Sequence, residues 1–281
     1  MKNPRHGLQA FFLFSACTLT QGQTLYTGLV GYWNFDEGTG SAVADLSGQG
    51  NNGTLFNGGS AWVAGHFGTA LSFPGVAGAG STRVEIPNAA SLQISNAVSF
   101  AAWVRVDDIN RDAPILAKEG PGGLLAYWFG TLGLNVESAV PGNFGMLLDV
   151  DGNQGWSVYD RNQGSLVQGT WAHIASTWDG SQISHYLNGT LVAGGAAFAG
   201  TVHASTAFLA IGANSNYNST AFLGLVDDLY LYNRALSVGE VGQLMAAPIP
   251  EPSAYGLFAG LGALGLAAVL RRRTRQSSRR D

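Results

Sequence analysis

The chain has 281 residues, of which 40 are glycine and 46% are hydrophobic, so it can form one large β domain with a sizeable core. Between Gln23 and Ile249 it carries 6 Arg and Lys residues against 16 Asp and Glu residues, a net charge of −10 that argues against a nucleic-acid partner. The single cysteine, Cys17, excludes a disulfide within the chain.

The first predicted element is a secretory signal peptide over residues 1–22. Lys2 and Arg5 give a positively charged start, and an apolar run from Ala10 to Leu19 is followed by small residues. This order is typical of export across the inner membrane. An alternative interpretation makes Cys17 the acylated residue of a lipoprotein, although the three residues before it match that signal poorly.

Residues 23–247 have the pattern of a single all-β domain. Alternating apolar runs, the clearest at residues 98–106, 170–177 and 222–232, are separated by turns rich in glycine and asparagine. Helical periodicity is scarce before Ser237. Together with Glu240, this serine predicts a capping box that opens a short helix ending near Ala246.

Two tryptophans are candidate sugar-stacking residues, Trp103 and Trp128. In the run from Val98 to Val106, Trp103 alternates with the valines and is expected on the outer face of its sheet. An exposed indole there could stack on a sugar ring. The alternative is that a neighbouring loop covers Trp103, and the sequence does not show whether either indole is exposed.

The run from Phe222 to Leu236 combines a strand pattern with two adjacent acids. Period-two alternation predicts that Asp227 shares a face with four leucines, on the core side of its strand. A carboxylate in that position needs a partner, a proton or a metal ion, because an unpaired buried charge is strongly unfavourable. The leucines are Leu223, Leu225, Leu229 and Leu231.

Five motifs along the domain point to one known family. They are Gly31-x-Trp33-x-Phe35-Asp36-Glu37, Asp45-x-Ser47-Gly48, Gly68-x-Ala70-Leu71-x-Phe73, Trp171-x-His173-x-Ala175, and Gly224-x-Val226-Asp227-Asp228 with the following Tyr232 to Ser237. Together they resemble the LamG-like jelly-roll family, in the concanavalin A-like lectin and glucanase group. The resemblance covers roughly residues 28–244 and implies a two-sheet antiparallel jelly-roll sandwich.

The same resemblance implies a structural calcium ion that ties the two ends of the domain together. Calcium takes about six to eight oxygen ligands, which a loop rich in Asp and Asn can help to provide. The alternative is that Asp227 only accepts hydrogen bonds from main-chain amides of the Asp45 loop. The candidate ligands, from the strongest to the weakest, are Asp45, Asp227, Gly53, Asn51, Glu37 and Asp228.

Residues 248–281 have the order of a C-terminal sorting tail. Pro250, Glu251 and Pro252 precede an apolar stretch at 254–270, and an arginine cluster follows at 271–280. As a helix, the apolar stretch would be about 26 Å long, just enough to cross a membrane with the arginines in the cytoplasm. This order resembles a PEP-CTERM tail, which implies processing by an exosortase-type transpeptidase. A permanent single-pass anchor is the alternative.

The sequence lacks the usual signatures of hydrolytic enzymes. It has no Glu-x-Asp-x-Glu run like that of glucanases, no HExxH motif and no Gly-x-Ser-x-Gly elbow. We therefore expect a non-catalytic recognition or matrix module at the cell surface or outside the cell, engaging a polysaccharide or surface glycan. A structural matrix protein without a discrete ligand is the alternative, and a glycoside hydrolase is the third.

Overall fold

The computed structural model describes residues 25–59, 61–120, 125–133, 141–150, 166–197, 199–214 and 220–249. The chain divides into two units, and Gln23–Pro248 contains every described strand and helix. The predicted signal peptide at 1–22, the sorting motif Pro250 to Pro252, the apolar stretch at 254–270 and the arginine cluster lie outside the described residues. Within the described ranges, no helix is both long and apolar enough to cross a membrane.

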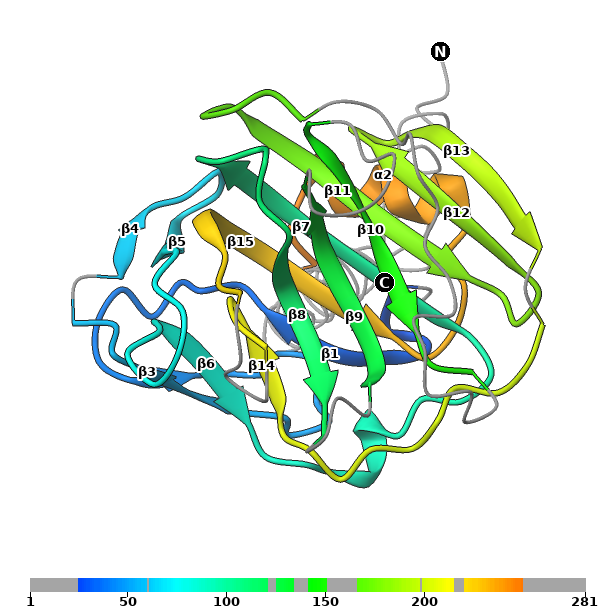
Figure 1. Ribbon diagram of the computed structural model, residues 1–281, viewed down its shortest axis with the longest axis horizontal. Coiled ribbons are helices and arrows are strands. Elements are labelled where there is room, and N and C mark those ends of the chain that lie inside the picture. The colour runs from blue at the N-terminus through cyan, green and yellow to red at the C-terminus, as the bar shows by residue number, and fades with distance from the viewer. Residues whose placement is uncertain are drawn as a thin grey trace, which may run out of the picture. The chain divides into compact units, whose positions relative to one another are not determined.

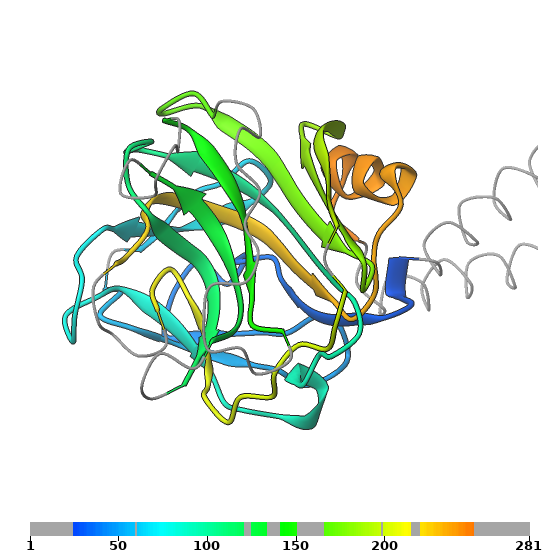
Figure 2. The ribbon, with the colours of Figure 1, turned by 45° about the vertical axis from the view of Figure 1, so that its right-hand side comes forward.

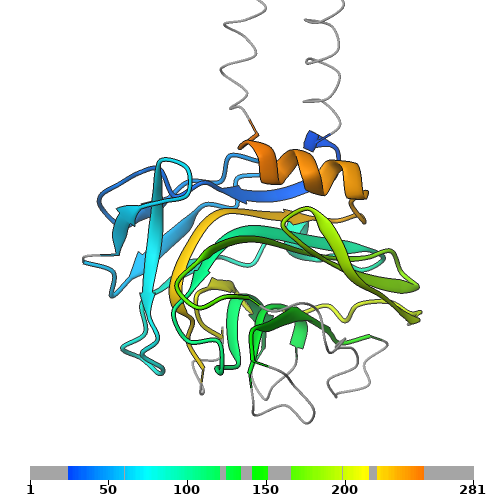
Figure 3. The same cartoon turned by 90° about the horizontal axis from the view of Figure 1, so that it is seen from above.

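The described residues of the unit Gln23–Pro248 form an all-β sandwich of two antiparallel sheets, as predicted (Figures 1 and 3). Sheet A contains, in spatial order, β13 (Thr190–Ala197), β12 (Gln182–Leu187), β11 (Trp171–Trp178), β7 (Val98–Val106), β15 (Leu223–Tyr232), β5 (Thr69–Pro74) and β4 (Trp62–Ala64), and β1 (Leu29–Trp33) also pairs with β15. Sheet B contains β10 (Asn143–Leu148), β9 (Leu125–Leu132), β8 (Ala113–Glu119), β14 (Leu209–Ile211), β6 (Arg83–Ile86), β3 (Gly53–Phe56) and β2 (Ala42–Val43). A short 3₁₀ helix, η1, spans Ala90–Leu92.

The core lies between the two sheets and follows the predicted alternation of β7. The residues of β7 that face the core are Val98, Phe100, Ala102, Val104 and Val106. The ring of Phe100 stacks on Phe129 of β9, with centroids 5.3 Å apart, and so joins sheet A to sheet B. Aromatic burial of this kind is a large part of the hydrophobic stabilisation of a sandwich.

The last strand departs from the predicted alternation. Asp227 pairs with Trp103 of β7, but Tyr230 pairs with Ala101, so β15 holds one extra residue at this point. Asp228 has a φ of 45°, and this β-bulge reverses the faces of the residues that follow it. Leu229 therefore faces the core, whereas Asp227 faces outward beside Trp103. The prediction that Asp227 lies among leucines on the core face is wrong.

The predicted terminal helix is present as α2 (Val238–Ala246). Ser237 accepts a hydrogen bond from the amide of Glu240, and the Glu240 carboxylate accepts one from the amide of Ser237 at 2.8 Å, which confirms the capping box. The helix lies on the face of sheet A that points away from sheet B, beside the β12–β13 hairpin (Figures 2 and 3). Ser99 of β7 holds the segment between β15 and α2 in place, because the Ser99 hydroxyl donates to the carbonyl of Arg234.

Candidate functional site

The Asp45 loop is held together by main-chain amides. The Asp45 carboxylate accepts hydrogen bonds from the amides of Tyr32, Ser47 and Asn51 at 2.8–3.0 Å, and from the Ser47 hydroxyl at 2.8 Å. These four bonds occupy both oxygens of Asp45 with protein donors. Such a pattern stabilises a turn next to β1 without any ion.

The other candidates from this part of the chain also have structural partners. The Asn51 side chain donates to the carbonyl of Val30 at 2.7 Å and accepts from the Ser91 hydroxyl at 3.0 Å. One carboxylate oxygen of Glu37 accepts from the amide of Ala44 at 2.7 Å, while the other is buried and has no hydrogen-bond partner within the described ranges. Gly53 is required by packing, since a Cβ atom there would lie 2.4 Å from Val84.

Asp227 and Asp228 lie where β15 changes its neighbour from β5 to β1. Asp227 is fully buried, and one of its oxygens accepts from the amides of His66 and Phe67 at 2.8 and 2.9 Å. The donors therefore come from the β4–β5 turn and not from the Asp45 loop. Asp228 accepts from the Tyr32 hydroxyl at 2.7 Å. Each acid also has a second buried oxygen for which the described residues provide no hydrogen-bond partner.

Burial makes both acids weaker than usual. It raises the pKa of Asp227 to about 7, with a further contribution from the neighbouring Asp228 carboxylate. It also raises the pKa of Asp228 to about 6, and the Asp36 carboxylate acts in the same direction. Within the described ranges, no three His, Cys, Asp or Glu side chains converge as a metal-binding group. Structural calcium therefore stays a prediction.

Trp103 lies on the outer face of sheet A, as alternation predicts, but its indole is only 8% exposed. The imidazole of His66 covers it, with ring centroids 3.5 Å apart and planes at 17°. His173 of β11 meets the indole edge-on at 5.5 Å, and burial lowers the pKa of His173 to about 3. The alternative that a neighbouring loop covers Trp103 is confirmed, so this indole is closed to a sugar ring in this conformation.

Trp128 lies on the outer face of sheet B and is also buried, with an exposed fraction of 6%. It pairs in register with Ala117 of β8 and Leu147 of β10, and the three side chains form a small apolar cluster with Leu132. In this structure Trp128 is part of that cluster and offers no open stacking face.

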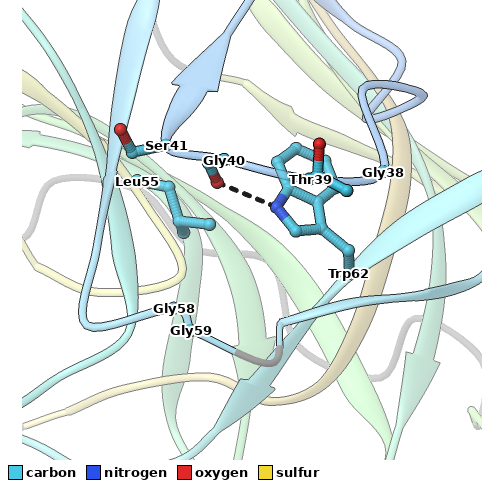
Figure 4. A pocket seen from close by; sticks show the side chains of 8 residues that line it. All are labelled: Gly38, Thr39, Gly40, Ser41, Leu55, Gly58, Gly59 and Trp62. Carbon is cyan, nitrogen blue, oxygen red and sulfur yellow. Dashed lines mark hydrogen bonds between the residues drawn. The ribbon is translucent and has the colours of Figure 1, made fainter.

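A pocket of about 540 Å³ opens beside a third tryptophan, Trp62 of β4 (Figure 4). The indole is partly exposed, and its Nε1 donates to the carbonyl of Gly40 at 3.0 Å, which fixes the ring against the loop before β2. The hydroxyls of Thr39 and Ser41 lie on exposed residues of that loop. The lining residues are Gly38, Thr39, Gly40, Ser41, Leu55, Gly58, Gly59 and Trp62, and none of these is charged.

Sequence reasoning missed this pocket. Trp62 lies in a short apolar piece that predicts no more than an edge strand, and the glycines at 38–40 and 58–59 predict only turns. The available signal was a tryptophan next to two glycine-rich loops. Only the folded chain shows that the two loops face each other across Trp62.

A family model described as the concanavalin A-like lectin/glucanases superfamily matches residues 78–242, more than half of the chain. A search of curated proteins gave no match. Among solved structures, the chain is similar to domain 4 of AbnA, a GH43 extracellular arabinanase from Geobacillus stearothermophilus, in complex with arabinotriose. The identity is 23% and the TM-score 0.57, with 77% of this chain and 98% of that chain covered.

Two further structures are similar over shorter fractions of their own length. The binding domain of Paraclostridial Mosquitocidal Protein 1 is 16% identical, with a TM-score of 0.58. The match includes 79% of this chain and 52% of that chain. Trypanosoma rangeli sialidase is 19% identical, with a TM-score of 0.53. This match includes 78% of this chain and 32% of that chain. At such identities the similarity shows a shared fold.

Proposed function

Since the chain belongs to the concanavalin A-like lectin/glucanases superfamily, we propose that it is a non-catalytic carbohydrate-binding module. The observation that carries this proposal is the Trp62 pocket, in which an indole stands beside an uncharged loop of glycine and hydroxyl residues. Its volume of about 540 Å³ is typical of small-molecule sites. The solved complex of AbnA domain 4 with arabinotriose supports a sugar as the ligand class.

The lining of the pocket suits a neutral polysaccharide. An indole offers a flat apolar face to the carbon-hydrogen side of a sugar ring, while hydroxyls and exposed main-chain groups can bond to the ring hydroxyls. A charged ligand would find no countercharge among the eight lining residues. For the same reason these residues lack the pair of carboxyl groups that glycoside hydrolysis needs. The hydrolase alternative therefore has no support at this pocket.

Export and sorting form a separate part of the proposal. A signal peptide at residues 1–22 and a PEP-CTERM-like tail with Pro250 to Pro252 would place the domain at the cell surface or outside the cell, after processing by an exosortase-type enzyme. The order of charged, apolar and basic segments in the sequence supports this. Proteolytic mapping of both ends of the exported protein tests it.

The proposal is tested by sugar binding of the purified full-length protein. On an array of neutral polysaccharides we expect binding that Trp62→Ala weakens by about 30-fold in Kd, since truncation of a central tryptophan typically removes about 2 kcal/mol. Phe56→Ala is the matched control, because Phe56 is an exposed aromatic residue that does not line the pocket. Equal binding by wild type and Trp62→Ala would refute the pocket, and no binding to any glycan would favour a purely structural matrix role.

Calcium is proposed as a structural ion only. The unpartnered buried oxygens of Asp227 and Asp228 support this, whereas the four hydrogen bonds to Asp45 argue that it is not a ligand in this conformation. Thermal unfolding in calcium and in chelator tests the idea. If the native state binds calcium, the midpoint of thermal unfolding rises with the calcium concentration, and Asp227→Ala abolishes this rise. An unchanged midpoint in the wild type removes calcium from the proposal.

A further inference from the structure

Three buried polar side chains lie next to one another on the outer face of sheet A. Trp103 of β7 pairs in register with Asp227 of β15 on one side and with His173 of β11 on the other. Side chains at paired positions of neighbouring strands point to the same face, so the row spans about 10 Å. Trp103 is 8% exposed, and Asp227 and His173 are fully buried.

The polar atoms of this row are not satisfied. The indole Nε1 of Trp103, both ring nitrogens of His173 and the Oδ1 of Asp227 are buried and have no hydrogen-bond partner among the described residues. Leaving such atoms without a partner is unfavourable, and proteins rarely gather several of them at one place. A row with several unpartnered donor and acceptor atoms therefore points to a ligand that bonds to part of it.

The cover over this row is a two-residue turn. Gly65 and Gly68 are joined by a main-chain hydrogen bond of 3.1 Å, and the residues between them are His66 and Phe67. The His66 ring is exposed on its far side and lies flat on Trp103, where a ligand ring would stack. The turn is tied down by the Oδ2 of Asp227, which accepts from both of its amides.

Gly65 is essential for this closed arrangement. A Cβ atom at this position would lie 2.6 Å from the Oδ2 of Asp227, so only glycine lets the turn approach the carboxylate this closely. Trp171 of β11 flanks the same place, with its ring centroid 6.0 Å from that of His66 and the two planes at 60°. Removal of the His66 ring would leave Trp103 as a floor with Trp171 at one side.

We propose that the Gly65–Gly68 turn is a lid over a second carbohydrate site, in which one neutral sugar ring replaces His66 on Trp103. A sugar hydroxyl both donates and accepts, so hydroxyls at the edge of the stacked ring can bond to His173 and, where no calcium ion occupies it, donate to the Oδ1 of Asp227. An anion would meet the Asp227 carboxylate. The ligand class rests on the proposed carbohydrate function, but the site shares no residue with the Trp62 pocket.

The test uses full-length protein carrying Trp62→Ala, so that the first pocket does not contribute. The probes are arabinose, glucose, galactose and mannose, measured by calorimetry. Adding His66→Ala removes the ring that occupies the site, and we expect the best of these sugars to bind about tenfold more tightly than to Trp62→Ala alone, since the competing stacked state is lost. Adding His173→Phe to that double variant should return the affinity to the Trp62→Ala level.

His173→Phe also separates binding from a structural role. Because neither ring nitrogen of His173 has a partner among the residues that the structure describes, an apolar ring of similar shape should leave the unfolding midpoint close to that of wild type. If His66→Ala does not increase the affinity for any of the four sugars, the covered site is wrong and the gap is filled by water. Binding by wild type that Trp62→Ala abolishes would then leave the proposed function standing without the second site.

Amide hydrogen exchange gives an independent readout in the wild-type protein. The amides of His66 and Phe67 are protected while they donate to Asp227. A sugar that opens the lid should accelerate exchange at these two amides, whereas a sugar in the Trp62 pocket should leave them unchanged. Unchanged exchange at a sugar concentration that saturates His66→Ala would show that the turn does not act as a lid.

Discussion

His185 of β12 provides a direct test of how burial controls stability in this fold. The side chain is fully buried, and its Nδ1 lies 2.7 Å from the hydroxyl of Ser176 on the paired strand. Its Nε2 is buried, and no described part of the chain offers it a hydrogen-bond partner. Burial lowers the pKa of His185 from 6.5 to about 4, because a protonated ring would lose its hydration without gaining a countercharge.

The sign and size of the effect follow from that shift. Below pH 6.5 the unfolded chain binds a proton at His185 that the folded chain does not, so stability present at neutral pH is lost as the pH falls toward 4. The difference between the two pKa values corresponds to about 3 kcal/mol, at about 1.4 kcal/mol per unit. This is a large share of the roughly 5–15 kcal/mol by which domains are usually stable.

The assay is urea unfolding of wild type and His185→Asn across pH 4 to pH 7. Asparagine can keep the hydrogen bond to Ser176 but does not titrate, so the difference in unfolding free energy between the two proteins isolates one group. We expect this difference to change by about 3 kcal/mol in favour of the variant as the pH falls to 4. Ser176→Ala retains the histidine and serves as the control. A difference that is constant with pH would refute the burial argument.

Three further substitutions test other parts of the structure by the same unfolding assay. For Asp227→Asn the pH dependence should be the opposite. Because the folded pKa of Asp227 is about 7, the wild type loses stability as the pH rises from 3.8 to 7, whereas the variant does not. A difference in unfolding free energy that is constant with pH would contradict this. Gly224→Ala should cost more than about 2 kcal/mol, since its Cβ atom would lie 2.1 Å from the carbonyl oxygen of Arg105, and an unchanged midpoint would show that β15 can shift. Ser237→Ala should cost about 1 kcal/mol by removing the cap of α2, with Ser237→Asp as the rescuing control.

The all-β character of the domain and its terminal helix could be predicted from the sequence because their signals are local, whereas the two-sheet sandwich was implied by the resemblance to a known family. In β7, alternation over nine residues was enough to place Trp103 on the outer face. The spacing of Ser237 and Glu240 was enough to begin α2. Both patterns depend only on the repeat of a single element, and tertiary contacts did not override them.

The bulge in β15 could not be predicted in this way. Period-two counting assumes a regular strand, whereas Asp228 adopts a φ of 45° and adds one residue to the ladder. The pair Asp227-Asp228 is compatible with either geometry, because aspartate tolerates the left-handed region better than most residues. The hydrogen-bond donors to Asp227 could not be predicted either, since the amides of His66 and Phe67 are 160 residues or more away in sequence.

The place of β15 in sheet A also sets the order in which the domain can fold. This strand bonds to β7 on one edge and to β5 and β1 on the other, yet it is the last described strand to leave the ribosome. Leu29 of β1 can pair with Tyr232 of β15 only after β15 has emerged. Until then the neighbouring strands have unpaired edges, which are prone to aggregation. Pairing at such long sequence separation is slow. The topology thus delays closure of sheet A until β15 has been synthesised.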